Sequence, residues 1–215
     1  MSSGRIEVVC GGMYSGKSEE LIRRVKRVQY AKKGVIVFKI DTDIRYDDNN
    51  VMTHDGIGVV AIPVANSQQI MDHIKGKKGE DGKYIIKPLT NTNVVAIDEV
   101  SLFDDDVVDV VEELANSGFR VIVAGLDQDY KGQTFYIMDK LMGLADDVQK
   151  LHAICTNCGE EACRSYRTVQ NDERIAIGSI GMYIPLCRKC FNIQRYIDCN
   201  KKCNNSVATL YSNMV

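Results

Sequence analysis

Residues 11–18 of the chain read GGMYSGKS, which matches the pattern G-x-x-x-x-G-K-[ST]. A β-branched run predicted to be a strand, Arg5–Cys10, precedes this stretch, and Glu19–Lys33, with apolar residues at helical spacing, follows it. A strand, a glycine-rich loop and a helix in this order are typical of a P-loop, in which backbone N–H groups and the helix N-terminus bind phosphate. The alternative interpretation is a glycine-rich turn that binds no ligand.

A second motif supports the phosphate-binding interpretation. The apolar stretch Asn93–Ile97 ends in the acids Asp98 and Glu99. In P-loop proteins an acid at a strand tip holds Mg²⁺, and a neighbouring carboxylate is placed to act as a base. The alternative is an acidic turn before the next helix, which residues 104–106 (DDD) would cap. The predicted ATP-binding residues are Gly11, Gly12, Met13, Tyr14, Ser15, Gly16, Lys17, Ser18 and Asp98, of which Ser18 and Asp98 are also the predicted magnesium ligands.

Strands that are apolar throughout alternate with helices along the first 150 residues. The predicted strands after the loop are Val35–Ile40, Val94–Ile97 and Val121–Ala124, and Val107–Ala115 is a predicted helix. This alternation predicts an α/β fold, with a parallel sheet covered by helices on both faces. The basic stretch Arg23–Arg27 on the first helix is predicted to be a solvent-exposed face.

The overall charge and hydropathy argue against two classes of partner. The 215 residues include 27 Lys and Arg against 29 Asp and Glu, for a net charge of −2. This balance gives no drive toward nucleic acid or an anionic membrane, and no apolar run approaches the roughly 18 residues of a membrane span. We therefore expect no nucleic-acid or membrane partner. Because residues 1–7 lack the features of a signal peptide, we also expect a cytoplasmic location.

The eight cysteines are distributed unevenly, since all but Cys10 lie at or after Cys155. This shift predicts a P-loop nucleotide-binding α/β domain over residues 1–150, a cysteine-rich module over 151–200 and a polar tail over 201–215. In a cytoplasmic protein, where thiols stay reduced, the cysteines do not indicate a disulfide scaffold. Cys10, Cys163, Cys199 and Cys203 have no predicted role.

Two C-x-x-C pairs within the module predict a tetrahedral zinc site. The predicted ligands are Cys155, Cys158, Cys187 and Cys190. The segment 159–186 between the pairs is longer than the roughly 15–20 residues usual for such sites, which predicts an extended loop or hairpin clipped at its base by a small zinc-ribbon-like module. Four thiolates leave no open coordination position, so the zinc is predicted to be structural. The alternative is two unrelated reduced pairs or redox chemistry.

The motifs taken together resemble the zinc-containing, cytosolic type of thymidine kinase. The resemblance runs from about Arg5 to Cys190, most of the chain. The residues that carry it are Gly11–Ser18, Glu20–Arg24, Asp43–Tyr46, Thr53–Asp55, Ile97–Glu99, Ala124–Asp127, Lys150–Leu151, Cys155, Cys158, Ile177–Gly178, Tyr183, Cys187, Arg188 and Cys190.

The resemblance implies an enzyme that transfers the γ-phosphoryl group of ATP to the 5′-hydroxyl of thymidine. The implied catalytic residues are Glu99, as general base, and Arg45. The implied cofactors are Mg²⁺ and structural Zn²⁺, the acceptor is thymidine or deoxyuridine, dTTP is a feedback inhibitor, and the assembly is a homotetramer. Residues 174–183 resemble a "lasso" loop that reads the pyrimidine. The implied substrate-binding residues are Met13, Leu102, Leu126, Tyr130, Phe135, Ser165, Ile177, Gly178 and Tyr183.

The sequence departs from the family pattern at several positions. Gly12 stands where the family usually has Pro, which makes the loop entry less rigid. Leu102 replaces an aromatic residue, Ser179 replaces a second glycine of the lasso, and Ser165 replaces a Thr. Two other functions compete with nucleoside kinase: a P-loop ATPase or GTPase switch that uses water as acceptor, and a zinc-ribbon nucleic-acid binder, for which the module is only mildly basic.

Overall fold

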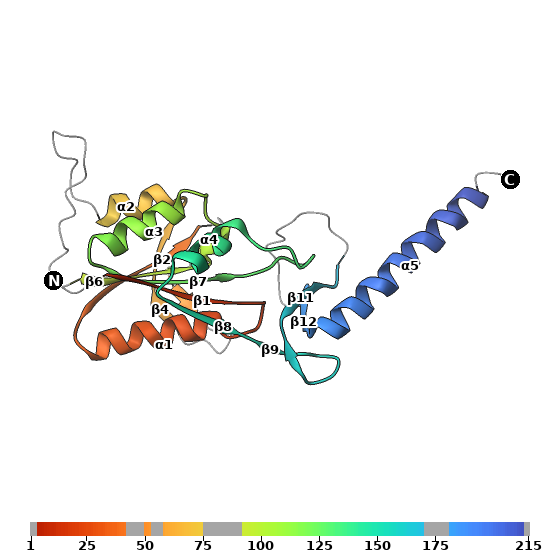
Figure 1. Ribbon diagram of the computed structural model, residues 1–215, viewed down its shortest axis with the longest axis horizontal. Coiled ribbons are helices and arrows are strands. Elements are labelled where there is room, and N and C mark those ends of the chain that lie inside the picture. Colours follow the sequence, from red (N-terminus) through yellow and green to blue (C-terminus); the bar gives the residue numbers. More distant parts are fainter. Residues whose placement is uncertain (1–3, 42–49, 53–57, 75–91, 170–180, 213–215) are drawn as a thin grey trace.

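The computed structural model describes residues 4–41, 50–52, 58–74, 92–169 and 181–212. At its centre is a six-stranded sheet with the strand order β5-β2-β6-β7-β1-β8, in which all neighbouring strands pair in parallel (Figure 1). This arrangement confirms the predicted α/β fold. The strands are β1 (Arg5–Gly11), β2 (Gly34–Ile40), β5 (Ile62–Val64), β6 (Thr92–Asp98), β7 (Arg120–Leu126) and β8 (Asp147–Leu151).

Helices cover both faces of the sheet. Successive residues of a strand point to opposite faces, and here both faces carry apolar side chains that must be buried. Along β1, Val8 and Cys10 pack in one apolar cluster and Val9 packs in the other. The second cluster includes residues of α1 (Lys17–Tyr30) and of a short antiparallel hairpin, β3 (Asn50–Met52) and β4 (Gly58–Val60). The first cluster includes three helices on the opposite face (Figure 1), which are α2 (Ser67–Ile74), α3 (Val107–Asn116) and α4 (Tyr136–Leu144).

The parallel register brings the carboxyl ends of the central strands to one edge of the sheet. Gly11 of β1 lies opposite Leu126 of β7. On the other side of β7, Val123 lies opposite Ile97, the residue before Asp98 at the end of β6. The predicted phosphate loop and the predicted acid pair therefore leave the sheet at the same edge, where α/β proteins bind their ligands.

The cysteine-rich module continues from the edge strand β8. It contains two antiparallel pairs and a small core of its own that includes Ala153, Leu186 and Phe191. The strands are β9 (Ala153–Ile154), β10 (Glu161–Ala162), β11 (Arg164–Arg167) and β12 (Tyr183–Leu186). The last helix, α5 (Arg188–Ser212), starts in the module, extends away from the sheet (Figure 1) and includes most of the predicted polar tail. Among the helices of the described ranges, none combines the length and the apolar character needed to cross a membrane.

The basic stretch on α1 is not the uniformly exposed face that the sequence predicted. Arg24 is buried and donates a hydrogen bond of 2.6 Å to the buried carboxylate of Glu7, which also accepts two hydrogen bonds, of 2.7 and 2.8 Å, from Arg120. Burial alone would raise the pKa of Glu7, but Arg120, Arg24 and Arg5 outweigh it and hold the pKa below its ordinary value. Helix α1 is thus attached to the sheet by charge as well as by apolar packing.

We predict that Glu7→Gln destabilises the fold, because it leaves buried guanidinium groups without their shared carboxylate. The expected loss is about 3 kcal/mol in the free energy of unfolding, measured by urea titration. Glu161→Gln, which breaks the exposed ion pair with His152, is the matched control and is expected to cost less than about 1 kcal/mol. Because the pKa of Glu7 is depressed, its contribution is present above pH 4.5 and is lost as pH falls further. Equal losses in both variants would contradict the structural role of Glu7.

Candidate active site

The phosphate loop depends on two glycines in backbone conformations that other residues rarely adopt. Gly11 has φ +149°, and a Cβ atom placed there would lie 2.3 Å from the carbonyl oxygen of Leu151 at the end of β8. Gly16 has φ +85° and lies in the left-handed region immediately before α1. The first N–H groups of α1, which begins at Lys17, have no acceptors within the helix. They form the positive helix end that P-loops direct at phosphate.

A pocket of about 260 Å³ lies where the phosphate loop meets the ends of β6 and β7. It brings Lys17 and Ser18 of the loop together with the acid pair Asp98 and Glu99, which lie 80 residues or more away in the sequence. One ammonium group and two carboxyl groups therefore face the same pocket. Its full lining is Met13, Tyr14, Lys17, Ser18, Asp98, Glu99, Ser101, Leu102, Gly125 and Leu126.

At the base of this pocket the buried side chain of Asp98 interacts with the half-buried side chains of Lys17 and Ser18. The carboxylate of Asp98 accepts hydrogen bonds from the Ser18 hydroxyl at 3.2 Å and from the Glu99 backbone N–H at 3.0 Å. Burial raises the pKa of Asp98, although these two hydrogen bonds and the charge of Lys17 oppose the rise. Burial also lowers the pKa of Lys17, against the opposing charge of Asp98. An added divalent cation would favour the ionised form of Asp98, and the oxygens of Asp98 and Ser18 are ligands of the kind that Mg²⁺ takes.

Glu99 adopts a left-handed backbone conformation, with φ +52° and ψ +36°, at the start of a short 3-10 helix, η1 (Val100–Leu102). For a residue with a side chain this conformation costs about 1–2 kcal/mol, and such strain clusters at active sites. The side chain is accessible to solvent in the pocket, yet the protein around it removes enough water to raise its pKa, and the charge of Asp98 adds to the rise. A carboxylate with a raised pKa is a stronger proton acceptor than an ordinary one.

The residues predicted to bind the acceptor substrate fall into several groups. Met13, Leu102 and Leu126 line the pocket beside Glu99. Ser165 is buried and accepts a hydrogen bond of 2.9 Å from the Met13 backbone N–H. Phe135 packs in the apolar core of the α3 face and is not part of the pocket lining. Arg45, Ile177 and Gly178, like residues 53–55, lie outside the described residues.

Tyr130 and Tyr183 enclose a residue that the sequence did not single out. The guanidinium carbon of Arg167 lies 3.7 Å from the centre of the Tyr130 ring and 5.2 Å from that of Tyr183. Arg167 also donates hydrogen bonds of 3.0 and 2.6 Å to the Tyr183 hydroxyl. Arg167 and Tyr183 are directly opposite each other on β11 and β12, so the cross-strand register of the module creates this contact.

Two residues of the pocket wall were missed by the sequence analysis. The buried Ser101 hydroxyl accepts a hydrogen bond of 3.1 Å from the Leu126 backbone N–H and so joins η1 to the end of β7. Gly125 packs so closely against its neighbours that an added Cβ would lie 2.8 Å from the Met138 sulfur. Gly125 lies in the Ala124–Asp127 stretch that carries the resemblance, but no site role was predicted for it or for Ser101, because each acts through a contact with another element of the fold.

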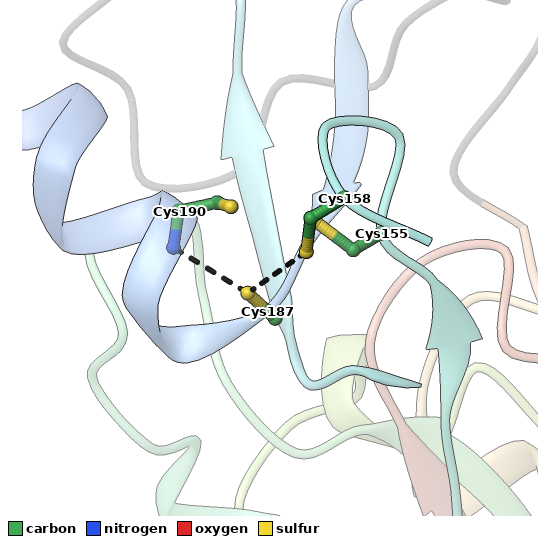
Figure 2. A group of neighbouring side chains, drawn as sticks. All are labelled: Cys155, Cys158, Cys187 and Cys190. Atoms are coloured by element: carbon green, nitrogen blue, oxygen red, sulfur yellow. Dashed lines mark hydrogen bonds between the residues drawn. The ribbon is translucent and has the colours of Figure 1, made fainter. Parts of the chain in front are cut away.

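The four cysteines predicted to bind zinc come together at one point of the module, as Figure 2 shows. Their sulfur atoms all lie within 4.8 Å of one another, and the sulfurs of Cys158 and Cys187 are 3.7 Å apart. Zn–S bonds of about 2.3 Å in a tetrahedron place two sulfurs roughly 3.8 Å apart, so the cluster fits a zinc ion closely. Cys155 and Cys158 follow β9, while Cys187 and Cys190 follow β12, so zinc would clip both pairs of strands together.

We predict that the purified protein contains about one zinc ion per chain, measured by elemental analysis. Cys187→Ala is expected to lose that zinc and to lower the melting temperature, because four-thiolate sites contribute directly to folding. Cys163→Ala, a half-buried cysteine outside the cluster, is the control and should keep its zinc. An unchanged zinc content in Cys187→Ala would contradict the assignment.

Comparison with known proteins agrees with this geometry. Residues 4–191 match the sequence profile of the family described as "Thymidine kinase". The chain is 44% identical to a thymidine kinase of Bacteroides thetaiotaomicron over 188 residues, which are 87% of each chain. It has the same identity and coverage with a thymidine kinase of Bacteroides fragilis strain YCH46. The chain therefore belongs to the thymidine kinase family.

Proposed function

We propose that this protein transfers the γ-phosphoryl group of ATP to the 5′-hydroxyl of thymidine, with Glu99 as the general base. The observation that carries the proposal is the pocket in which the phosphate loop and the acid pair of β6 meet. Phosphoryl transfer depends mainly on positioning and on charge stabilisation, and this pocket offers groups suited to both. Membership of the thymidine kinase family supports thymidine as the acceptor.

In this mechanism the triphosphate lies along the loop, with Lys17 and the N-terminal N–H groups of α1 neutralising its charge. Asp98 and Ser18 would hold Mg²⁺, which would supply positive charge to offset the negative charge that develops during transfer. The 5′-oxygen of thymidine forms a bond to the γ-phosphorus as the bond to the β–γ bridging oxygen breaks. Glu99 accepts the proton of that hydroxyl, and ADP leaves. Arg45 is proposed to stabilise the transferring group.

The nucleoside is proposed to bind beside Glu99, against the apolar side chains that line the pocket. The side chains of Met13, Leu102 and Leu126 offer an apolar surface against which a pyrimidine and its sugar would pack. Ile177, Gly178 and Tyr183 are proposed to read the base, together with Tyr130 and Ser165, whereas Phe135 packs in the apolar core and is not proposed to contact it. A structural zinc in the four-cysteine cluster would fix both ends of residues 159–186, the segment that carries Ser165, Ile177, Gly178 and Tyr183, because β11 and β12 pair across its base.

Several further features of the proposal rest on the family resemblance. They are acceptance of deoxyuridine beside thymidine, feedback inhibition by dTTP, assembly as a homotetramer and a cytoplasmic location. Acceptance of deoxyuridine is the simplest of these features to test, because one coupled assay with ATP measures the rates with both nucleosides. Leu102, which stands where the family often has an aromatic residue, is the lining residue we expect to influence that ratio.

We predict that Glu99→Gln lowers kcat by at least a hundredfold while the affinity for ATP stays within about threefold of the parent, because the amide cannot accept the proton. The measurement combines ADP release with thymidine present and calorimetric titration with ATP. Glu112→Gln, an exposed position on α3, is the matched control and should retain full activity. Full activity in Glu99→Gln would overturn the base assignment, and ATP hydrolysis that ignores every nucleoside would favour a water-using ATPase.

The pH dependence of kcat/KM is expected to reflect the raised pKa of Glu99. Glu99 must be ionised to accept the proton, so activity should rise with pH through a midpoint above the ordinary glutamate value of 4.5. The measurement is kcat/KM for thymidine at saturating Mg-ATP between pH 4 and 8. A midpoint at or below 4.5 would contradict a raised pKa of Glu99.

A further inference from the structure

The peptide unit that joins Gly12 to Met13 is held from both sides. On the inner side, the Gly12 carbonyl oxygen accepts hydrogen bonds from the Lys17 ammonium at 2.7 Å and from the Ser15 hydroxyl at 2.8 Å. On the outer side, the Met13 N–H donates a hydrogen bond of 2.9 Å to the Ser165 hydroxyl oxygen. The contact on the outer side comes from β11, in the cysteine-rich module, 152 residues further along the chain.

Because a peptide unit is planar, its two hydrogen-bonding groups turn together. The Ser165 bond fixes the direction of the Met13 N–H, and it therefore also fixes the direction of the Gly12 carbonyl that receives Lys17. If the outer bond is lost, the whole unit is able to rotate, and the acceptor that positions the Lys17 ammonium rotates with it. The orientation of one peptide thus links Ser165 to the principal cation of the phosphate loop.

The residue type at position 12 makes an external restraint necessary. Glycine populates a wide range of backbone conformations, so Gly12 places little limit on the orientation of the next peptide. A proline at this position would fix φ by itself. The absence of a side chain at Gly12 also leaves room for the Ser165 hydroxyl, since a Cβ atom on Gly12 would lie only 3.2 Å from the Ser165 oxygen.

Ser165 is itself held rigidly. It is buried, lies within β11 and is paired directly with Pro185 of β12. Two residues after Pro185 the chain reaches Cys187, one of the four clustered cysteines. The restraint on the phosphate loop therefore originates in the part of the fold that the cysteine cluster organises.

We infer that Ser165 is a positioning residue for triphosphate binding, through which the cysteine-rich module sets the orientation of the Gly12–Met13 peptide and hence of Lys17. The inference deepens the proposed function and rests on it, because it assumes that the loop binds ATP. The cysteine-rich module would then influence the binding of ATP, in addition to its proposed influence on the binding of the nucleoside.

The test compares the zinc-loaded wild-type protein with Ser165→Ala and Ser165→Thr by calorimetric titration, with the imido analogue of ATP plus Mg²⁺ and, separately, with thymidine. Loss of the hydroxyl is expected to weaken binding of the ATP analogue about five- to tenfold, the size of one hydrogen bond to a buried partner. Ser165→Thr keeps the hydroxyl and should restore binding to within about twofold. Thr156→Ala, which removes an exposed hydroxyl of the same module, is the control and should bind like the wild type.

Unchanged affinity of Ser165→Ala for the ATP analogue would overturn the inference, as would a loss confined to thymidine, which would assign Ser165 to the acceptor pocket alone. If the wild type fails to bind the analogue, the proposed function falls, and this inference falls with it. Zinc depletion, verified by elemental analysis, is expected to weaken analogue binding in the wild type but to add little in Ser165→Ala. Equal additional losses in both proteins would overturn the link to the module.

Discussion

The site depends on the parallel register of β1, β7 and β6. Parallel strands connected by helices on the two faces all end at the same edge of the sheet, and here that edge receives Gly11, Leu126 and Asp98. The phosphate loop, the acid pair and the wall of the pocket are each a continuation of one of these strands. A shift of one residue in any strand would turn its buried side chains to the opposite face, so the apolar core that stabilises the fold also fixes the geometry of the site.

The buried charges at the end of the sheet work against folding. Burial raises the pKa of Asp98 and lowers the pKa of Lys17, so each charged form is less favourable here than in the unfolded chain. For Asp98, a folded pKa above the unfolded value means that stability is lost as pH rises through it. Glu99 adds a strained backbone. At neutral pH these groups thus destabilise the fold, and binding of Mg²⁺ and phosphate would offset this effect.

The sequence predicted the fold well where a local pattern determines the structure. The strands β1, β2, β6 and β7 and the helix α3 lie within about two residues of their predicted bounds, because apolar periodicity reflects burial directly. The end of α1 was predicted too late, at Lys33, since the helix ends at Tyr30 and Lys32 takes a left-handed conformation. Arg24 and Ser101 could not be placed, because their partners lie far away in the chain. The cysteine spacing, by contrast, was sufficient to predict the cluster that forms.

The walls of the phosphate loop are provided by residues that lie about 140 to 150 positions further along the chain. Leu151 lies against Gly11, and Ser165 holds Met13. During synthesis the loop therefore leaves the ribosome long before either support exists, and β1 cannot enter the sheet until β7 has been made. Long-range pairing of this kind folds late and exposes apolar strands in the interval. The nucleotide motif is translated well before its supports and is thus among the last segments to become rigid, and a nascent chain truncated before Leu151 would contain the motif without a competent site.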